Sequence, residues 1–361
     1  MMDQITQPVL VVDEVRCRAN IRMMLGKARD FGARLRPHFK THQSLETGRW
    51  FREEGVDAIA VSSVSMARFF AADGWRDIMI AFPVNFREME EINRLAGVTD
   101  LGLVVSCQHS AAMLPGKMST PADVYLKIDV GSHRTGFDPD RPEELRLALD
   151  RLAEDAHLRI RGFIAHAGHT YQSDNRQQLL EVFSAGRQAL LGLRESFSSV
   201  HAGLMVSWGD TPSCWLSDDL ANLDELRPGN FVYFDTMQLD LGVCTRDELA
   251  VTVAAPVVAL HPEREEVVVY AGAVHLSKEQ GMGKNGKAHF GRVVFYDAQG
   301  LIQWPGQDLF VERLSQEHGI IRMPREMVMD LRPGDLLGIV PVHSCLAADL
   351  LRETYVVRAG P

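Results

Sequence analysis

Short apolar segments rich in β-branched residues alternate with longer helical patterns along the first two thirds of the chain. The strand-like segments lie at 35–39, 58–63, 77–82, 101–106, 124–130, 160–167, 204–208 and 231–235. Segments 141–156 and 175–197 between them carry apolar residues at three- and four-residue spacing, which is typical of helices. Eight strands with helices in most gaps predict an α/β fold, a (β/α)8 TIM-like barrel. A doubly wound open sheet is the alternative, but no strand precedes a Gly-x-Gly-x-x-Gly turn, which disfavours a dinucleotide-binding version of it.

The pattern changes after about residue 250. Strand-like segments at 250–260, 265–274, 289–297, 336–343 and 354–360 are separated by turns rich in Gly, Pro and Asp. This pattern predicts an antiparallel β-domain. The early segment 5–12 is also strand-like and is expected to pair with it. We therefore expect a barrel domain at 13–250 and a β-domain at 251–361 that includes the strand at 5–12.

Charge and composition exclude several classes of function. The net charge is -10 and no long basic run is present, which argues against nucleic acid as a partner. No apolar run approaches 18 residues, so we expect no membrane partner. The first residues lack the basic and apolar regions of a signal peptide. The five cysteines are odd in number and scattered, which does not suggest a disulfide framework and favours a cytoplasmic location.

Lys40 lies at the end of the first predicted strand, in RPHFKTH. Barrel enzymes keep their chemistry at the carboxyl ends of the strands. A lysine that is partly desolvated there loses its proton more readily and can bind an aldehyde cofactor covalently. A solvated lysine in a loop is the alternative interpretation.

Two tight turns contain glycine, GDTPS at 209–213 and RPGN at 227–230. They fall at the end of the seventh predicted strand and before the eighth. Barrels often hold a phosphate with the loops near their last strands, where glycine lets backbone N–H groups approach closely. Considered alone, the two segments are better explained as ordinary tight turns.

His343 and Cys345 are two residues apart after a strand-like run. Along a strand both side chains would leave the same face. Imidazole and thiolate are good zinc ligands, and two protein ligands would leave positions open for water and substrate. The alternative is that Cys345 is only a buried thiol.

Six motifs occur in a fixed order along nearly the whole chain: RPHFKTH, DVGSHRTGF, HAGHTY, GDTPS, RPGNFVYFD and PVHSC. Together they resemble the family of D-serine dehydratases and D-threonine aldolases, which are fold-type III pyridoxal-phosphate enzymes related to alanine racemase. The resemblance implies that pyridoxal 5'-phosphate is bound covalently to Lys40, which also serves as the catalytic base. The remaining cofactor contacts that it implies are Arg134, His169, Tyr171, Gly209, Thr211, Gly229 and Asn230.

In this resemblance Arg134 faces the phenolic oxygen of the cofactor and Tyr171 contacts the cofactor with support from His169. Thr211, Gly229 and Asn230 hold the phosphate, and Gly209 shapes the turn. His343 and Cys345 form the metal pair, with zinc as the expected ion and manganese or magnesium as alternatives. The segment 271–291 does not match the family pattern, which leaves the substrate open.

The expected function is a pyridoxal-phosphate- and zinc-dependent lyase that acts on small D-β-hydroxy amino acids. The His-x-Cys pair favours a dehydratase over a D-threonine aldolase, since the aldolases often show His-x-Asp. An amino acid racemase and a non-catalytic cofactor-binding protein are the further alternatives. Either a homodimer or a monomer is consistent with the resemblance.

Overall fold

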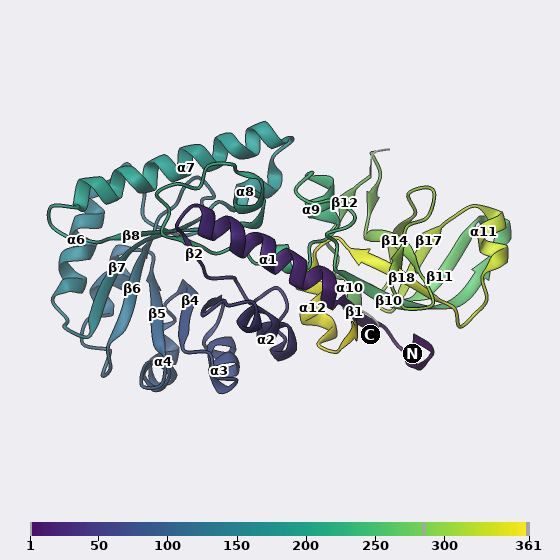
Figure 1. The fold of residues 1–361 in the computed structure, drawn as a ribbon, viewed down its shortest axis with the longest axis horizontal. Coiled ribbons are helices and arrows are strands. Elements are labelled where there is room, and N and C mark those ends of the chain that lie inside the picture. The colour runs from purple at the N-terminus through teal and green to yellow at the C-terminus, as the bar shows by residue number, and fades with distance from the viewer. Residues whose placement is uncertain (1, 284–285, 359–361) are drawn as a thin grey trace. The chain divides into compact units, whose positions relative to one another are not determined.

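The computed structural model describes residues 2–283 and 286–358 (Figure 1). The chain divides into two compact units. The barrel unit holds residues 21–40 and 44–231, and the β-unit holds the residues before 21, residues 41–43, and the chain from 232 onward. The motif around Lys40 is thus divided, because Lys40 belongs to the barrel unit and Thr41 to the β-unit. Within the described residues, no helix has the length and apolar character that a membrane span requires.

The barrel unit contains an eight-stranded parallel sheet. Its strands are β2 (Arg34–Leu35), β3 (Ala58–Val61), β4 (Asp77–Pro83), β5 (Asp100–Val105), β6 (Ala122–Lys127), β7 (Leu158–His166), β8 (Met205–Gly209) and β9 (Glu225–Leu226). Each pairs with its neighbour in chain order, and β9 pairs with β2. The sheet closes where His38, just after β2, forms a parallel bridge with Ala60 of β3. The predicted (β/α)8 barrel is confirmed.

The eighth strand lies earlier in the chain than the sequence analysis placed it. Segment 231–235 is not a strand, since it continues from the 3-10 helix η4 (Asn230–Val232), and the strand is β9 instead. The φ angle of Phe234 is 51°, a left-handed conformation that breaks an extended run. A short aromatic and β-branched run does not distinguish a strand from other buried backbone. RPGN therefore follows the eighth strand rather than preceding it.

Helices occupy the gaps between the strands (Figure 1). They are α1 (Glu14–Asp30), α2 (Leu45–Glu53), α3 (Val64–Ala72), α4 (Met89–Ala96), α5 (Gln108–Met113), α6 (Pro142–Ala153), α7 (Arg176–Phe197) and α8 (Thr211–Leu216). One cluster of buried side chains comes from five consecutive strands, β3 to β7: Ala60, Met79, Val104, Tyr125 and Ile164. Arg36 pairs with Glu225 and Asp77, and both of its ion pairs are largely shielded from water. The barrel interior is therefore packed, so its chemistry is confined to the strand ends.

The β-unit is built on a nine-stranded sheet of mostly antiparallel pairs. Its strands are β1 (Val9–Asp13), β10 (Val251–His261), β11 (Glu266–Tyr270), β14 (Gly291–Tyr296), β15 (Ile302–Gln303), β16 (Phe310–Leu314), β17 (His318–Arg322), β18 (Leu336–Pro341) and β19 (Thr354–Val357). The early strand β1 lies between β10 and β19, antiparallel to the first and parallel to the second. The predicted antiparallel β-domain is thus present, with one parallel pair.

Shorter elements extend from this sheet. They are α9 (Thr236–Asp240), α10 (Ala273–Leu276), α11 (Arg325–Asp330), α12 (Ser344–Leu351) and the hairpin of β12 (Gly281–Met282) with β13 (Ala288–His289). Helix α10 packs against α12, and β12 packs against α9.

Candidate functional site

Lys40 follows β2 at the carboxyl end of the barrel strands. Its backbone N–H donates to His38 Nδ1 at 3.4 Å, and its side chain is exposed. The expected partial desolvation of Lys40 is therefore wrong for this structure, because the residue lies on the rim of the barrel rather than within its interior. The position after the first barrel strand agrees with the sequence prediction.

Four of the predicted cofactor residues meet at the ends of β7, β8 and β9. The hydroxyl of Thr211 accepts hydrogen bonds from the backbone N–H groups of Gly229 (3.3 Å) and Asn230 (3.0 Å). The backbone N–H of Thr211 in turn donates to the Tyr171 hydroxyl at 3.4 Å. Because Thr211 is the first residue of α8, backbone donors from two loops converge on one small region. Such a group of N–H donors suits a phosphate.

Gly209 ends β8 at a position where a side chain would be crowded. A Cβ atom there would lie 3.1 Å from Cβ of Arg227 and 3.2 Å from its backbone oxygen. Arg227 is buried and donates to the Ser207 hydroxyl and to the Ala165 carbonyl. Gly209 thus allows Arg227 to enter the barrel beneath the converging loops.

The loop that carries Arg134 is folded by its own backbone. Phe137 N–H donates to the Lys127 carbonyl at 2.8 Å, and Asp129 N–H donates to the Phe137 carbonyl at 2.9 Å. The Asp129 carboxylate also accepts from the backbone N–H groups of Gly131 and His133. These bonds close the loop on itself and leave Arg134 exposed at the rim.

The loop after β7 contains the remaining predicted residues. His169 lies beside Gly131, where a Cβ would be 3.4 Å from its Nε2, and in the described part of the chain its buried Nδ1 has no hydrogen-bond partner. Burial lowers the pKa of His169, against a smaller opposing effect of Asp129. The ring of His166 lies 6.5 Å from that of Tyr171 at 37°. His166 ends β7 and so stands between the barrel interior and this loop.

The barrel unit concentrates positive charge around His166. Burial lowers the pKa of His166 well below its usual range, and Lys127, Lys40, Arg134 and Arg227 lower it further through their charges. Sequence reasoning did not select Lys127 and Arg227 as site residues. A lysine within the apolar run VYLKIDV was a usable signal, because a lysine in a buried strand requires an explanation.

His343 and Cys345 lie in the β-unit at the start of α12. Their side chains lie close enough for the thiol to influence the imidazole, and the thiol donates to the Thr41 hydroxyl at 3.3 Å. The two residues converge because His343 is the N-cap of α12 and Cys345 is in its first turn. The expectation that both lie on one strand is wrong, since β18 ends at Pro341.

Two carboxylates hold this pair of residues. Asp235 is buried and accepts from the backbone N–H of Ser344 at 2.9 Å while it caps α9 through Gln238 N–H. Glu279 Oε2 lies 2.8 Å from His343 Nδ1. Burial lowers the pKa of His343, but the interactions with Cys345 and Glu279 outweigh this effect and raise the pKa to about 11. The sequence analysis assigned no role to Asp235 or Glu279.

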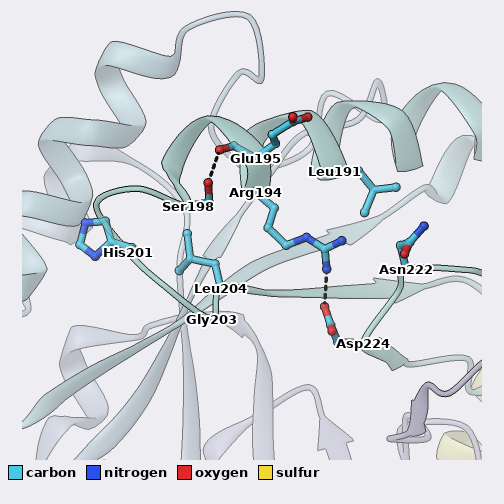
Figure 2. A pocket seen from close by; sticks show the side chains of 9 residues that line it. All are labelled: Leu191, Arg194, Glu195, Ser198, His201, Gly203, Leu204, Asn222 and Asp224. Atoms are coloured by element: carbon cyan, nitrogen blue, oxygen red, sulfur yellow. Dashed lines mark hydrogen bonds and ion pairs between the residues drawn. The ribbon is translucent and has the colours of Figure 1, made fainter.

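A pocket of about 610 Å³ lies elsewhere on the barrel unit (Figure 2). Figure 2 shows Arg194 of α7 reaching Asp224, with Leu204 and Asn222 nearby. Leu204 and Asp224 immediately precede β8 and β9, so the pocket is at the amino-terminal end of the strands. Barrel active sites form at the opposite end. This pocket is therefore not the candidate site.

The chain is similar to known proteins over nearly its whole length. The sequence profile of the alanine racemase N-terminal domain matches residues 12–237, and that of a serine dehydratase domain matches residues 250–357. A D-threo-3-hydroxyaspartate dehydratase from Delftia sp. strain HT23 is 30% identical over 94% of this chain and 90% of its own. A D-serine dehydratase from Dictyostelium discoideum is 28% identical over 98% of this chain and 93% of its own.

The chain belongs to the D-serine dehydratase and D-threonine aldolase family. The family consists of fold-type III pyridoxal-phosphate lyases, so the chain is an enzyme of that class. The solved structure of the Delftia dehydratase superposes with a TM-score of 0.90 at 27% identity, over 99% of this chain and 96% of that one. A variant of the same enzyme in which a cysteine is replaced by alanine is described as being in the metal-free form.

The barrel unit of this family member fits pyridoxal 5'-phosphate. The phosphate and the phenolate of the cofactor are anionic, and the barrel unit supplies basic side chains, with Lys40 and Arg134 exposed at the rim and Lys127 and Arg227 buried. The backbone donors at Gly229 and Asn230 already converge on a hydroxyl oxygen, that of Thr211. Charge and donor geometry therefore both suit the cofactor.

We predict that Lys127 makes the stability of the cofactor-free protein depend on pH. Burial lowers its pKa to about 7, with a further contribution from Arg227 and Arg134. Because this lies below the pKa of a lysine in an unfolded chain, unfolding takes up a proton between pH 7 and about 10.5, and stability due to Lys127 rises with pH in that window. Relative to Lys127→Met, the wild type should gain roughly 2–3 kcal/mol of unfolding free energy between pH 7 and pH 9.

Urea unfolding of both proteins at several pH values measures this difference. Lys278→Met removes an exposed lysine and serves as the control, which should follow the wild type at each pH. Parallel pH profiles of wild type and Lys127→Met would show that Lys127 keeps its proton in the folded state throughout this range.

Proposed function

We propose that this chain is a dehydratase of D-3-hydroxy amino acids that uses pyridoxal 5'-phosphate and a divalent metal, with zinc as the metal. The proposal depends chiefly on one observation, the convergence of the His343 imidazole and the Cys345 thiol at the start of α12. The dehydratase relatives, which include enzymes for D-serine and D-threo-3-hydroxyaspartate, support the same reaction.

The donor set of the β-unit suits a metal in an open site. Imidazole nitrogen and thiolate sulfur favour zinc over harder ions, which prefer oxygen ligands. In the Delftia relative, the histidine and the cysteine replaced in two solved variants are separated by one residue, as His343 and Cys345 are here, and the cysteine variant is in the metal-free form. Two protein ligands leave coordination positions for water and substrate, as in catalytic zinc sites.

The roles of the chain's own residues follow from their positions. When bound, pyridoxal 5'-phosphate supplies an electron sink for charge that develops at Cα of the substrate. Lys40 is exposed on the rim and is proposed to remove the Cα proton. Thr211, Gly229 and Asn230 hold the phosphate end, and the exposed Arg134 offers its charge to the phenolic oxygen. His343 and Cys345 hold the ion, which as a Lewis acid would assist departure of the β-hydroxyl group.

The proposed base is adjacent in sequence to a residue that contacts the proposed metal pair. Lys40 is followed directly by Thr41, and the Thr41 hydroxyl accepts a hydrogen bond from Cys345. Loss of the Cα proton and of the β-hydroxyl releases water from the substrate. The enamine product then hydrolyses to a keto acid and ammonia, which balances the overall reaction.

A substrate screen tests the proposal. The purified protein is incubated with zinc and pyridoxal 5'-phosphate and with D-serine, D-threo-3-hydroxyaspartate or D-threonine, and each L-enantiomer serves as the control. Keto acid and ammonia from a D-substrate are the expected products. Assays for aldehyde with glycine and for the inverted amino acid run in parallel.

Each competing function has its own product. Aldehyde and glycine would support aldol cleavage, which a D-threonine aldolase from Arthrobacter, 27% identical over 99% of this chain and 90% of its own, makes a specific alternative. Accumulation of the L-enantiomer would show a racemase. Cofactor binding without turnover of any of these D-amino acids would favour a non-catalytic role.

A further inference from the structure

We propose that Glu279 is a positioning residue for the metal site, a carboxylate that holds the His343 imidazole in the orientation and tautomer in which it binds the ion. The inference deepens the proposed function and rests on it in one respect, that a divalent metal binds at His343 and Cys345. It also gives a role to part of the segment 271–291, which the sequence patterns left without one.

The contact between the two side chains is direct. Glu279 Oε2 lies 2.8 Å from His343 Nδ1, while 40% of the Glu279 side chain and 25% of the His343 side chain are exposed. A carboxylate beside Nδ1 favours a proton on that nitrogen, so Nε2 is the ring nitrogen left to bind a metal once its own proton is displaced. The same contact fixes the plane of the ring and makes the imidazole a stronger ligand.

The backbone around Glu279 is anchored on both sides. Before it, Ala273 and Val274 donate their N–H groups to the carbonyls of Ser315 and Gln316, at 2.9 and 3.2 Å. The Glu279 N–H itself donates to the Ser277 hydroxyl at 3.2 Å. After it, β12 pairs with β13. The carboxylate is thus presented by a constrained segment rather than by a free loop.

Gly272 shows how closely this segment is held. A Cβ at Gly272 would lie 2.3 Å from the backbone oxygen of Gln316, a distance that no side chain tolerates. Helix α10 therefore approaches the turn between β16 and β17 at backbone contact. Since α10 also packs on α12, the segment that carries Glu279 starts from a helix held against the one that His343 caps.

Glu279 is placed behind the metal pair rather than within it. Among residues 2–283 and 286–358, no three His, Cys, Asp or Glu side chains are grouped closely enough to hold an ion. Glu279 contacts the ring edge that carries Nδ1, and Cys345 supplies the second ligand. A direct ligand and a positioning residue differ in what their loss changes, because only the former alters the coordination sphere.

The test measures zinc affinity of the metal-free full-length protein by titration against a chromophoric chelator at one fixed pH. Glu279→Gln should raise the dissociation constant for zinc about 10- to 100-fold. The cobalt-loaded variant, at saturation, should keep the thiolate charge-transfer and ligand-field bands of the wild type. The thermal transition of the metal-free protein should not move.

Two matched variants make the result specific. Glu263→Gln also removes a carboxylate that faces a histidine, here His261 Nδ1 at 3.4 Å, and it should leave zinc affinity unchanged. In a His343→Ala background, Glu279→Gln should cause no further loss of zinc affinity, because a residue that acts through His343 has no effect without it.

The outcomes separate this inference from the proposed function. Zinc binding that Cys345→Ala loses but Glu279→Gln retains in full would overturn the role of Glu279 alone. An equal loss in the His343→Ala background, or altered cobalt bands, would also overturn it, since Glu279 would then act by itself. A wild-type protein without a zinc site would overturn the metal site and the role of Glu279 together.

Discussion

Replacing Lys40 with alanine is expected to lower turnover of the D-amino acid substrate by at least about 10³-fold, because the change removes both the covalent anchor and the base. The cofactor should still bind without a covalent bond, since its phosphate contacts at Thr211, Gly229 and Asn230 remain. Borohydride reduction of the cofactor-loaded wild type, followed by peptide mapping, should find the cofactor on Lys40. The alanine variant should carry no such label.

Lys40→Arg sharpens this experiment, because it keeps the positive charge on the rim but cannot bond to the aldehyde. It should behave like the alanine variant if covalent attachment is what matters. Lys278→Ala, in the β-unit, is the matched control and should retain label and turnover. A label found on Lys127 or Lys278 of the wild type would refute the assignment of Lys40.

Removing the metal is expected to abolish most of the turnover while leaving the protein folded. Chelation should lower activity by about 100-fold or more, since a Lewis acid contributes several kcal/mol to transition-state stabilisation, and zinc should restore it. The packed barrel and the nine-stranded sheet do not depend on the ion, so the thermal transition should stay nearly in place. Cys345→Ala should match the chelated wild type and still carry the cofactor on Lys40.

Cys345→Asp is the sharper variant because it exchanges a soft ligand for a hard one. Oxygen ligands favour manganese or magnesium over zinc, so the order in which metals restore activity should shift toward those ions. Cys244→Ala removes another buried cysteine of the β-unit and should leave the metal preference unchanged. Full turnover after chelation, or zinc retained at full occupancy by Cys345→Ala, would show that Cys345 is only a buried thiol.

The barrel was predictable because its signal is repeated. Each buried parallel strand contributes an apolar, β-branched run, and helical periodicity fills the gaps between them. The weakest prediction fell where one short run was judged alone. Segment 231–235 has strand-like residues, but a left-handed Phe234 and the cap formed by Asp235 turn it into the start of α9 instead.

His343 and Cys345 were predicted to converge along a strand, but the structure brings them together at the start of a helix. Two-residue spacing along a strand was the argument, whereas His343 caps a helix and Cys345 begins it. Side chains at this spacing can converge either along a strand or at the start of a helix. The two residues were therefore the right ones to examine even though the expected strand is absent. The supporting carboxylates were beyond reach, because Asp235 and Glu279 lie 108 and 64 residues before His343.

The sequence by itself determined the barrel class, the antiparallel β-domain, and the motifs that identify the family, because local periodicity and local motifs are written in consecutive residues. Only the tertiary structure decided which distant groups act on them. It placed Lys127 and Arg227 in the barrel among the cations around His166, and it placed Glu279 2.8 Å from His343. Such groups meet through the pairing of strands and the packing of helices, which no spacing along the chain encodes.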